Sequence, residues 1–237
     1  LSKCDLVDDE WLELVKLEID DSLLGSSLQG ATIVPVSAAT GQGLDELKNS
    51  LDKLLEETPI RKDLDRPRLP VDRSFTMSGF GTVVTGTLLD GSLQVGQEVV
   101  LVPSGKQARV RGIQAHRQGV DRIGPGRRVA VNLSGLNHGD VNRGEVLTTP
   151  GWLMPTRTVS AYLRILPGMP RGVKHNLGVT FHAGTNETNA RLRLLDSEEL
   201  KPGQDGWAQF DLQHPMALVK GESFVIRSSQ WTLGGGE

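Results

Sequence analysis

With 237 residues, 37% of them hydrophobic, the chain can bury the cores of two or three small domains. No apolar run approaches the length of a membrane span and no signal peptide opens the sequence, so we expect a soluble protein without a membrane partner. Cys4 is the only cysteine, which excludes an intramolecular disulfide and fits a reducing, cytoplasmic setting.

The net charge of −3 hides an uneven distribution along the chain. Residues 1–60 carry 4 basic and 13 acidic side chains, residues 61–157 carry 14 and 8, and residues 158–237 carry 8 and 8. A basic middle segment in an acidic protein predicts a local anion-binding site rather than a surface that coats nucleic acid. Scattered, solvated arginines on a β surface would give the same counts.

The first segment, residues 1–60, reads as helix, strand and helix. An apolar side chain every fourth position predicts an amphipathic helix over 7–24, with the stripe Val7, Trp11, Val15, Ile19 and Leu23. The run Ala31–Ser37 predicts a parallel strand that is covered on both faces, and leucines 44, 47, 51 and 54 predict a helix that ends at Thr58–Pro59. Such a piece cannot form a sheet alone, so we expect the end of a larger α/β domain, and the whole chain to be a fragment.

Residues 61–150 read as short strands separated by glycine-rich turns. Alternation over 66–77 and a β-branched run over 82–89 predict two strands, with turns at Ser78–Gly79 and Asp90–Gly91. Gly81 and Gly86 interrupt this pattern, which predicts bulges or a close approach of two backbones. Further strands are predicted over 98–102, 107–115, 127–133 and 145–148. The absence of any helical pattern indicates a small closed β-barrel.

A linker near Pro150–Pro155 leads into the last segment, residues 151–237, which is again strand-like. The predicted strands are 157–166, 175–181, 189–195, 206–212, 216–219 and 222–227. The predicted fold class is therefore mostly β, with two consecutive small antiparallel barrels after an α/β remnant.

Two short motifs in the first segment resemble the guanine-recognition motifs of P-loop GTPases. Ser2-Lys3-Cys4-Asp5 resembles N/T-K-x-D, although Ser2 replaces Asn or Thr, and Ser37-Ala38 resembles the later S-A-x. The resemblance implies GTP as cofactor: Asp5 would accept hydrogen bonds from guanine N1 and its amine, Lys3 would cover the ring, and Ser37 and Ala38 would close the pocket. Each motif alone is common as a cap or a turn.

The phosphate loop G-x-x-x-x-G-K-[ST] does not occur in the sequence. The ligands for the phosphates and for Mg²⁺ are therefore missing, and we do not expect this chain to hydrolyse GTP by itself. No Ser/His/Asp arrangement suggests a catalytic site, and the scattered histidines, including His138, show no metal-ligand spacing. The four tryptophans, Trp231 among them, lie far apart and are expected in cores or interfaces.

Four ordered blocks in the middle segment resemble the second domain of translational GTPases. They are Gly79–Gly86, Leu93–Gly96, Gly126–Ala130 and Asn142–Leu147. Phe224–Arg227 followed by Thr232–Gly236 resembles the third domain, which in this family contacts the tRNA stem. The resemblance implies phosphate contacts by Lys174, Arg191 and Arg193, whereas arginines at this spacing are otherwise often just solvated.

Within that superfamily, Leu69–Arg73, Val110–Gln114 and Gly126–Gly135 resemble the bacterial selenocysteine-specific elongation factors. This resemblance implies a GTP-dependent carrier of selenocysteyl-tRNA to the ribosome, with a messenger-RNA hairpin read by domains outside this chain. Two alternatives stay open: another translational GTPase of the general elongation or initiation type, and a GTPase-like scaffold that binds proteins but no RNA.

The same resemblance implies that Asp72, Arg73 and Arg128 bind the aminoacyl end. A selenol is more acidic than a thiol, whose ordinary pKa is about 8.5, so selenocysteine is an anion at neutral pH and an arginine-lined pocket would prefer it. On the residues alone, the Asp72–Arg73 pair could equally be a surface salt bridge, and Arg128 could pair with Asp121 across a turn.

Overall fold

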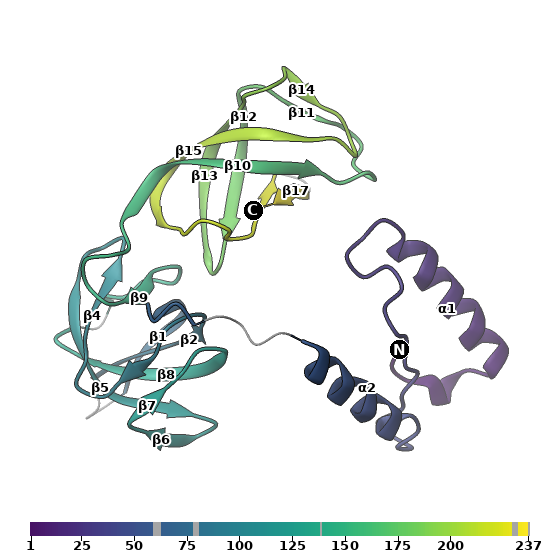
Figure 1. The fold of residues 1–237 in the computed structure, drawn as a ribbon, viewed down its shortest axis with the longest axis horizontal. Helices are drawn as coiled ribbons and strands as arrows, with labels where there is room; N and C mark the ends of the chain where they lie inside the picture. The colour runs from purple at the N-terminus through teal and green to yellow at the C-terminus, as the bar shows by residue number, and fades with distance from the viewer. Residues whose placement is uncertain (59–62, 78–80, 138, 229–231, 237) are drawn as a thin grey trace. The chain divides into compact units, whose positions relative to one another are not determined.

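The computed structural model describes residues 1–58, 63–77, 81–137, 139–228 and 232–236. The chain divides into two compact units, Leu1–Lys62 and Asp63–Glu237. The helices lie in the first unit, whereas the regular elements in the described part of the second unit are strands (Figure 1). The predicted mostly β fold class with two barrels is confirmed. Among the described residues, no helix combines the length and the apolar character needed to cross a membrane. The Ser78–Gly79 turn, the Gly79–Phe80 start of a family block, Pro59, His138 and Trp231 lie outside the described residues.

The first unit contains a 3-10 turn, η1 (Cys4–Leu6), and two helices, α1 (Asp9–Leu23) and α2 (Leu44–Glu57). Asp8 caps α1, because its Oδ1 accepts a hydrogen bond of 3.0 Å from the backbone N–H of Trp11. The predicted stripe on this helix is only partly right. Val15, Ile19 and Leu23 are half-buried, as a stripe requires. Trp11, however, is 59% exposed and Val7 lies outside the helix in solvent. The buried residue of α1 is Leu12, which the predicted stripe does not include.

The strand predicted over 31–37 is reduced to a single parallel bridge between Ser2 and Val36. Around this bridge the N–H of Val36 donates to the carbonyl of Leu1 at 2.8 Å, and the N–H of Cys4 donates to the carbonyl of Val36 at 3.2 Å. A strand that is apolar on both faces needs neighbouring strands and covering helices. Here a segment of only a few residues lies beside it, so the pairing does not extend.

The first barrel is a ring of six strands that closes through the pairing of β4 with β5. In ring order the strands are β4 (Glu98–Val102), β9 (Val146–Thr148), β1 (Arg68–Met77), β2 (Gly81–Leu88), β8 (Arg127–Ser134) and β5 (Gln107–Ala115). The short strands β3 (Leu93–Gln94), β6 (Gln118–Val120) and β7 (Arg122–Ile123) add to it. Its core is aliphatic, with Leu69, Val84, Leu101, Val131 and Leu147 fully buried.

Strand β1 carries a bulge opposite Gly86, as the interrupted pattern predicted. The register with β2 shifts between Val71 and Arg73, so Asp72 is the extra residue. Gly86 has to be a glycine here, because a Cβ atom at this position would lie 2.2 Å from the carbonyl oxygen of Pro70. The bulge and the close approach occur together and fix the local path of β1.

The second barrel is closed, in the order β10-β15-β13-β12-β16-β17. Its strands are β10 (Pro155–Ile165), β12 (Leu177–Ala183), β13 (Asn186–Leu194), β15 (Asp205–Ala217), β16 (Phe224–Arg227) and β17 (Thr232–Gly236), with a separate pair β11 (Val173–Lys174) and β14 (Glu199–Leu200). Phe181, Phe210 and Phe224 form the centre of its core, with ring centroids 4.9 to 5.4 Å apart.

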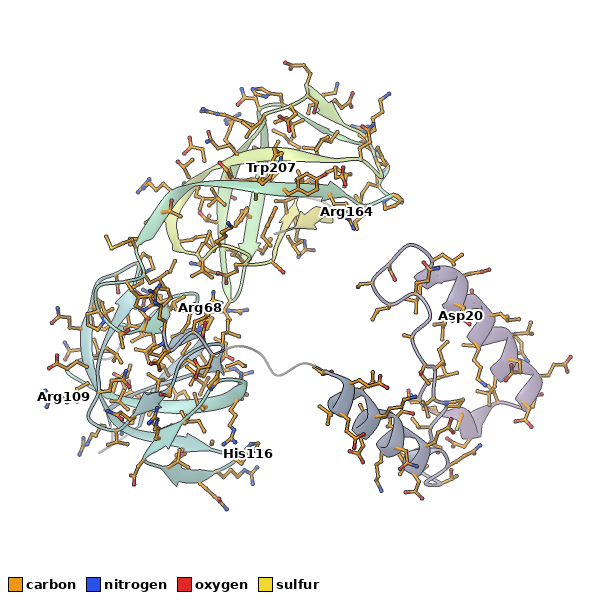
Figure 2. All side chains as sticks on the ribbon, viewed as in Figure 1. Asp20, Arg68, Arg109, His116, Arg164 and Trp207 are labelled. Atoms are coloured by element: carbon orange, nitrogen blue, oxygen red, sulfur yellow. The ribbon has the colours of Figure 1, made fainter. Side chains whose placement is uncertain are left out.

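Apolar packing and an ion pair help to join the barrels. Val102 and Val146 of the first barrel share a small buried cluster with Leu153 of the linker and Ala217 of the second barrel. Arg68 (Figure 2) donates from Nη1 to Glu222 Oε2 at 2.7 Å, and the two side chains are only 8% and 13% exposed. The strand that carries the bulge is therefore anchored to the second barrel.

Candidate functional site

The bulge in β1 places Asp72 and Arg73 on the outer surface of the first barrel. Arg73 lies opposite Thr85 of β2, and Arg128 of β8 lies opposite Thr87. Thr85 and Thr87 are two positions apart on one strand, so their side chains point to the same face of the sheet. Opposite residues of antiparallel strands share a face, and Arg73 and Arg128 therefore lie on this face as well.

Asp72 is held by two residues from the neighbouring strands. Arg128 donates from both terminal nitrogens to the Asp72 carboxylate, from Nη1 to Oδ2 and from Nη2 to Oδ1, the latter at 3.1 Å. Thr85 Oγ1 donates to Asp72 Oδ1 at 2.6 Å. A bidentate arginine fixes the plane of a carboxylate, so the orientation of Asp72 is well defined. Within the described residues the partner of Arg128 is Asp72 and not Asp121.

Burial of Asp72 would by itself raise the pKa of its carboxyl, yet the net pKa is lowered. The hydrogen bonds from Arg128 and Thr85 cause the lowering, and the positive charges of Arg128 and Arg73 add to it. The same contact with Asp72 raises the pKa of Arg128. Asp72 is therefore an anion at neutral pH, and Arg73 is near enough for its charge to be felt there.

The two arginines of the site differ in their ion-pair partners. The guanidinium of Arg128 faces the carboxylate of Asp72, which compensates its charge. Arg73 is exposed and has no hydrogen-bonded or ion-paired partner within the described part of the chain. An anion that approaches this face would therefore find the free guanidinium on Arg73. Sequence reasoning missed Thr85, whose role depends on the register between β1 and β2.

The two segments with the guanine-motif resemblance are joined by the parallel bridge between Ser2 and Val36. Lys3 and Ser37 directly follow the two bridged residues, and Asp5 and Ala38 follow further along the same two segments. Ser37 is fully buried and its hydroxyl accepts from the N–H of Thr40 at 3.2 Å, so this side chain shapes the turn. Asp5 and Ala38 are exposed, and in the described residues the N–H of Ala38 has no acceptor.

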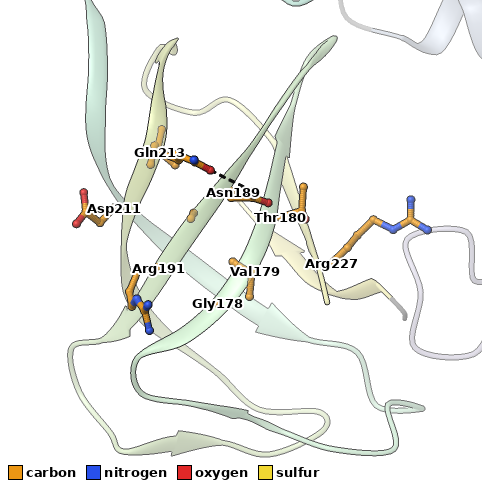
Figure 3. Close-up of a pocket in the computed structure, with 10 residues that line it drawn as sticks. Gly178, Val179, Thr180, Asn189, Arg191, Asp211, Gln213 and Arg227 are labelled. Atoms are coloured by element: carbon orange, nitrogen blue, oxygen red, sulfur yellow. Dashed lines mark hydrogen bonds between the residues drawn. The ribbon is translucent and has the colours of Figure 1, made fainter. Parts of the chain in front are cut away.

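On the second barrel, a hollow of about 500 Å³ lies over strands β12, β13, β15 and β16 (Figure 3). Arg191 and Arg227 line it, and Arg227 was missed by sequence reasoning. Arg191 donates to the carbonyl of Asn176 at 3.1 Å, and Asn189 donates to Gln213 at 3.1 Å across the floor of the hollow. Arg193, two residues from Arg191 on β13, lies 3.9 Å from Asp211.

Comparison with protein families gives a match for each barrel. Residues 81–148 match the model of elongation factor Tu domain 2. Residues 164–237 match the model of the selenocysteine-specific elongation factor β-barrel domain.

Whole-chain comparisons give the same family. A protein of Desulfomicrobium baculatum named selenocysteine-specific elongation factor is 43% identical over 228 residues, which are 96% of this chain and 36% of that protein. The crystal structure of a bacterial selenocysteine-specific elongation factor, EF-Sec, has 30% identity and a TM-score of 0.86, and the match covers this whole chain and 38% of that one. The apo structure of translation elongation factor SelB from Methanococcus maripaludis has 25% identity and a TM-score of 0.87, with 99% and 56% covered. The chain thus spans little more than a third of the curated relative.

Proposed function

Since the chain belongs to the selenocysteine-specific elongation factors, we propose that it supplies the two barrel domains of a factor that carries selenocysteyl-tRNA to the ribosome. The intact factor would use GTP, act in the cytoplasm, and read a messenger-RNA hairpin through domains outside this chain. Residues 1–60 would be the end of its GTPase domain, 61–150 its second domain, and 151–237 its third.

The observation that carries the proposal is the cluster of Asp72, Arg73 and Arg128 on one outer face of the first barrel. Asp72 and Arg128 would set the geometry of an aminoacyl site, because their bidentate contact fixes the orientation of both side chains. Arg73 would contact the side chain of the amino acid. A free guanidinium attracts a selenolate more strongly than a neutral hydroxyl or thiol, so the site would favour selenocysteine over serine and cysteine.

For the nucleotide, the residues present fit the base and not the phosphates. The free N–H of Ala38 would donate to guanine O6, and the exposed carboxylate of Asp5 would accept from N1 and the amine. Lys3 would cover the ring, and Ser37 would hold the turn that presents Ala38. In the intact factor, the phosphates and Mg²⁺ would be held by residues outside this chain.

The second barrel would contact the tRNA stem through Lys174, Arg191, Arg193 and Arg227. Arg191 and Arg227 line a hollow on this barrel, and arginines in such a place suit the phosphates of an RNA backbone, which they position without reading sequence. Removing one such arginine should weaken binding of every aminoacyl-tRNA to a similar extent and reduce its salt dependence.

The test is discrimination between selenocysteyl-tRNA and seryl-tRNA by the intact factor. We expect Arg73→Ala to reduce the ratio of the two affinities at least tenfold, about 1.4 kcal/mol, through weaker binding of selenocysteyl-tRNA. Arg111→Ala is the matched control, because Arg111 is an exposed arginine on β5 of the same barrel without a described partner. An unchanged ratio for Arg73→Ala and Arg128→Ala would show that this cluster does not select the amino acid.

A further inference from the structure

The hairpin between β12 and β13 of the second barrel contacts the bulged strand of the first barrel. Thr185, at the tip of this hairpin, donates from Oγ1 to the carbonyl oxygen of Val71 at 2.9 Å. Gly184 lies against the ring of Pro70, since a Cβ atom at Gly184 would be 3.9 Å from Pro70 Cβ. The hairpin tip therefore meets β1 directly before the extra residue Asp72.

The backbone carbonyl and the backbone N–H of Val71 both form hydrogen bonds in this region. The carbonyl oxygen also accepts from the N–H of Gly144 at 2.9 Å, and the N–H of Val71 donates to the carbonyl of Glu145 at 2.8 Å. Gly144 has φ +92°, and a Cβ atom there would lie 2.7 Å from Asn186 Cγ in the hairpin. The turn at 144–145 and the hairpin tip thus both form hydrogen bonds with the backbone of Val71.

The carbonyl of Val71 belongs to the peptide group that joins Val71 to Asp72. Two hydrogen bonds to this oxygen fix the orientation of that planar group, and hence the direction in which the bulge leaves β1. We infer that Thr185 is a positioning residue for the amino acid site, which acts across the barrel interface by holding the Val71–Asp72 peptide. The inference rests on the proposed role of Asp72 and Arg73.

A second contact supports this assignment. Arg68, three residues before Val71 on β1, is paired with Glu222 of the second barrel in a largely buried contact. In the described part of the chain, the second barrel therefore holds β1 at Arg68 and at Val71, and the contact of Val71 with Thr185 adjoins the bulge. Removal of the Thr185 hydroxyl should loosen the bulge while the Arg68 contact keeps the barrels joined.

The experiment compares hydroxyl removal at two threonines of the second barrel in the intact factor. Thr185→Val keeps the β-branched shape and removes the donor to Val71. Thr188→Val is the matched control, because Thr188 lies on the same hairpin, is 5% exposed, and uses its hydroxyl within the second barrel, where it accepts from the N–H of His214 at 3.1 Å. Thr185→Ser restores the hydroxyl without the methyl group.

We expect Thr185→Val to reduce the ratio of selenocysteyl- to seryl-tRNA affinity about 3- to 10-fold, the factor that one hydrogen bond is typically worth. Thr185→Ser should recover the ratio, and Thr188→Val should leave it unchanged. A second readout needs no tRNA: the pKa of the Asp72 carboxyl, followed by NMR, should rise in Thr185→Val, because the hydrogen bonds from Arg128 and Thr85 and the attraction of the Arg73 charge weaken.

The outcomes separate this inference from the proposed function. If Arg73→Ala abolishes discrimination while Thr185→Val changes neither the ratio nor the pKa of Asp72, the positioning role is wrong and the amino acid site stands. If Arg73→Ala has no effect on discrimination, the amino acid site is wrong, and the pKa of Asp72 in Thr185→Val alone decides whether the hairpin holds the bulge. Thr185→Ala replaces Thr185→Val in both measurements if the valine variant does not fold.

Discussion

At the scale of residues, the contact between Asp72 and Arg128 fixes the orientation of the carboxylate and contributes little to the free energy of unfolding. The Arg128 side chain is 58% exposed, and exposed ion pairs contribute at most about 1 kcal/mol because water and salt screen them. The bidentate geometry and the added bond from Thr85 instead restrict the carboxylate to one orientation. Mutation of this pair should therefore change the proposed discrimination between selenocysteyl- and seryl-tRNA more than it changes the free energy of unfolding.

The lowered pKa of Asp72 predicts the sign of its pH dependence. A carboxyl whose pKa is lower in the folded than in the unfolded protein stabilises the fold at neutral pH, and this contribution is lost as the pH falls through the lowered pKa. Asp72→Asn should therefore unfold more easily than the parent at neutral pH, and the difference should shrink in acid. Urea denaturation at several pH values measures this difference.

The control for that measurement is the exposed pair of Glu98 and Arg109, which are 74% and 63% exposed. Glu98→Gln should have little effect at any pH because its contact is solvated. A pH dependence of Asp72→Asn equal to that of Glu98→Gln would contradict the structural account of the Asp72 site.

At the scale of elements, sequence patterns predict strands well where glycine-rich turns delimit them. The predicted strands 98–102 and 107–115 agree with β4 and β5 to the residue. The strand predicted over 206–212 and the first half of the one predicted over 216–219 are instead one strand, β15, which ends at Ala217. Pro215 interrupts the pattern, but an irregularity in the β10–β15 pairing between Thr156 and Thr158 accommodates it.

Sequence patterns do not predict the features that depend on pairing between strands far apart in the chain. The short strands β3 and β7, for example, pair with each other, as a separate two-stranded sheet of segments that lie far apart in the sequence. Asp72 and Arg128 are 56 positions apart, so their contact depends on the register of β1, β2 and β8, which no local pattern encodes. The resemblance to a family singled out these two residues, but neither the bond from Thr85 nor the contact with the second barrel.

The bulge in β1 can be tested through Gly86. Gly86→Ala would bring a Cβ atom against the carbonyl of Pro70, and a clash with backbone cannot be relieved by a rotamer change. We expect a loss of about 1–3 kcal/mol in the free energy of unfolding, as is typical of overpacking, measured by chemical denaturation. Gly112→Ala on β5 is the control, because no atom lies within 4 Å of its added Cβ. Equal effects at both glycines would show that the close approach at Gly86 is unimportant.

At the scale of the whole molecule, the two barrels of the second unit keep a fixed arrangement only while the contacts between them are intact. Among the described residues, the apolar cluster between them contains four buried side chains, those of Val102, Val146, Leu153 and Ala217. The contact of Arg68 with Glu222 is a second, largely buried link between the barrels, and Glu222 Oε2 also accepts from the N–H of Val219 at 3.2 Å. Because β1 carries both Arg68 and the bulge, loss of this junction would also affect the position of Asp72 and Arg73, the residues of the proposed amino acid site.

A buried ion pair predicts different effects for the removal of one partner and of both. Glu222→Gln leaves the charge of Arg68 buried without a counterion and should cost about 3–5 kcal/mol, whereas the double replacement Arg68→Met with Glu222→Leu should cost far less. Calorimetry on the chain should show the single variant unfolding in two steps, as the barrels lose their coupling, and the double variant in one. If the double variant is as unstable as the single one, the charges themselves stabilise the junction, and the second barrel holds β1 by electrostatic attraction rather than by shape.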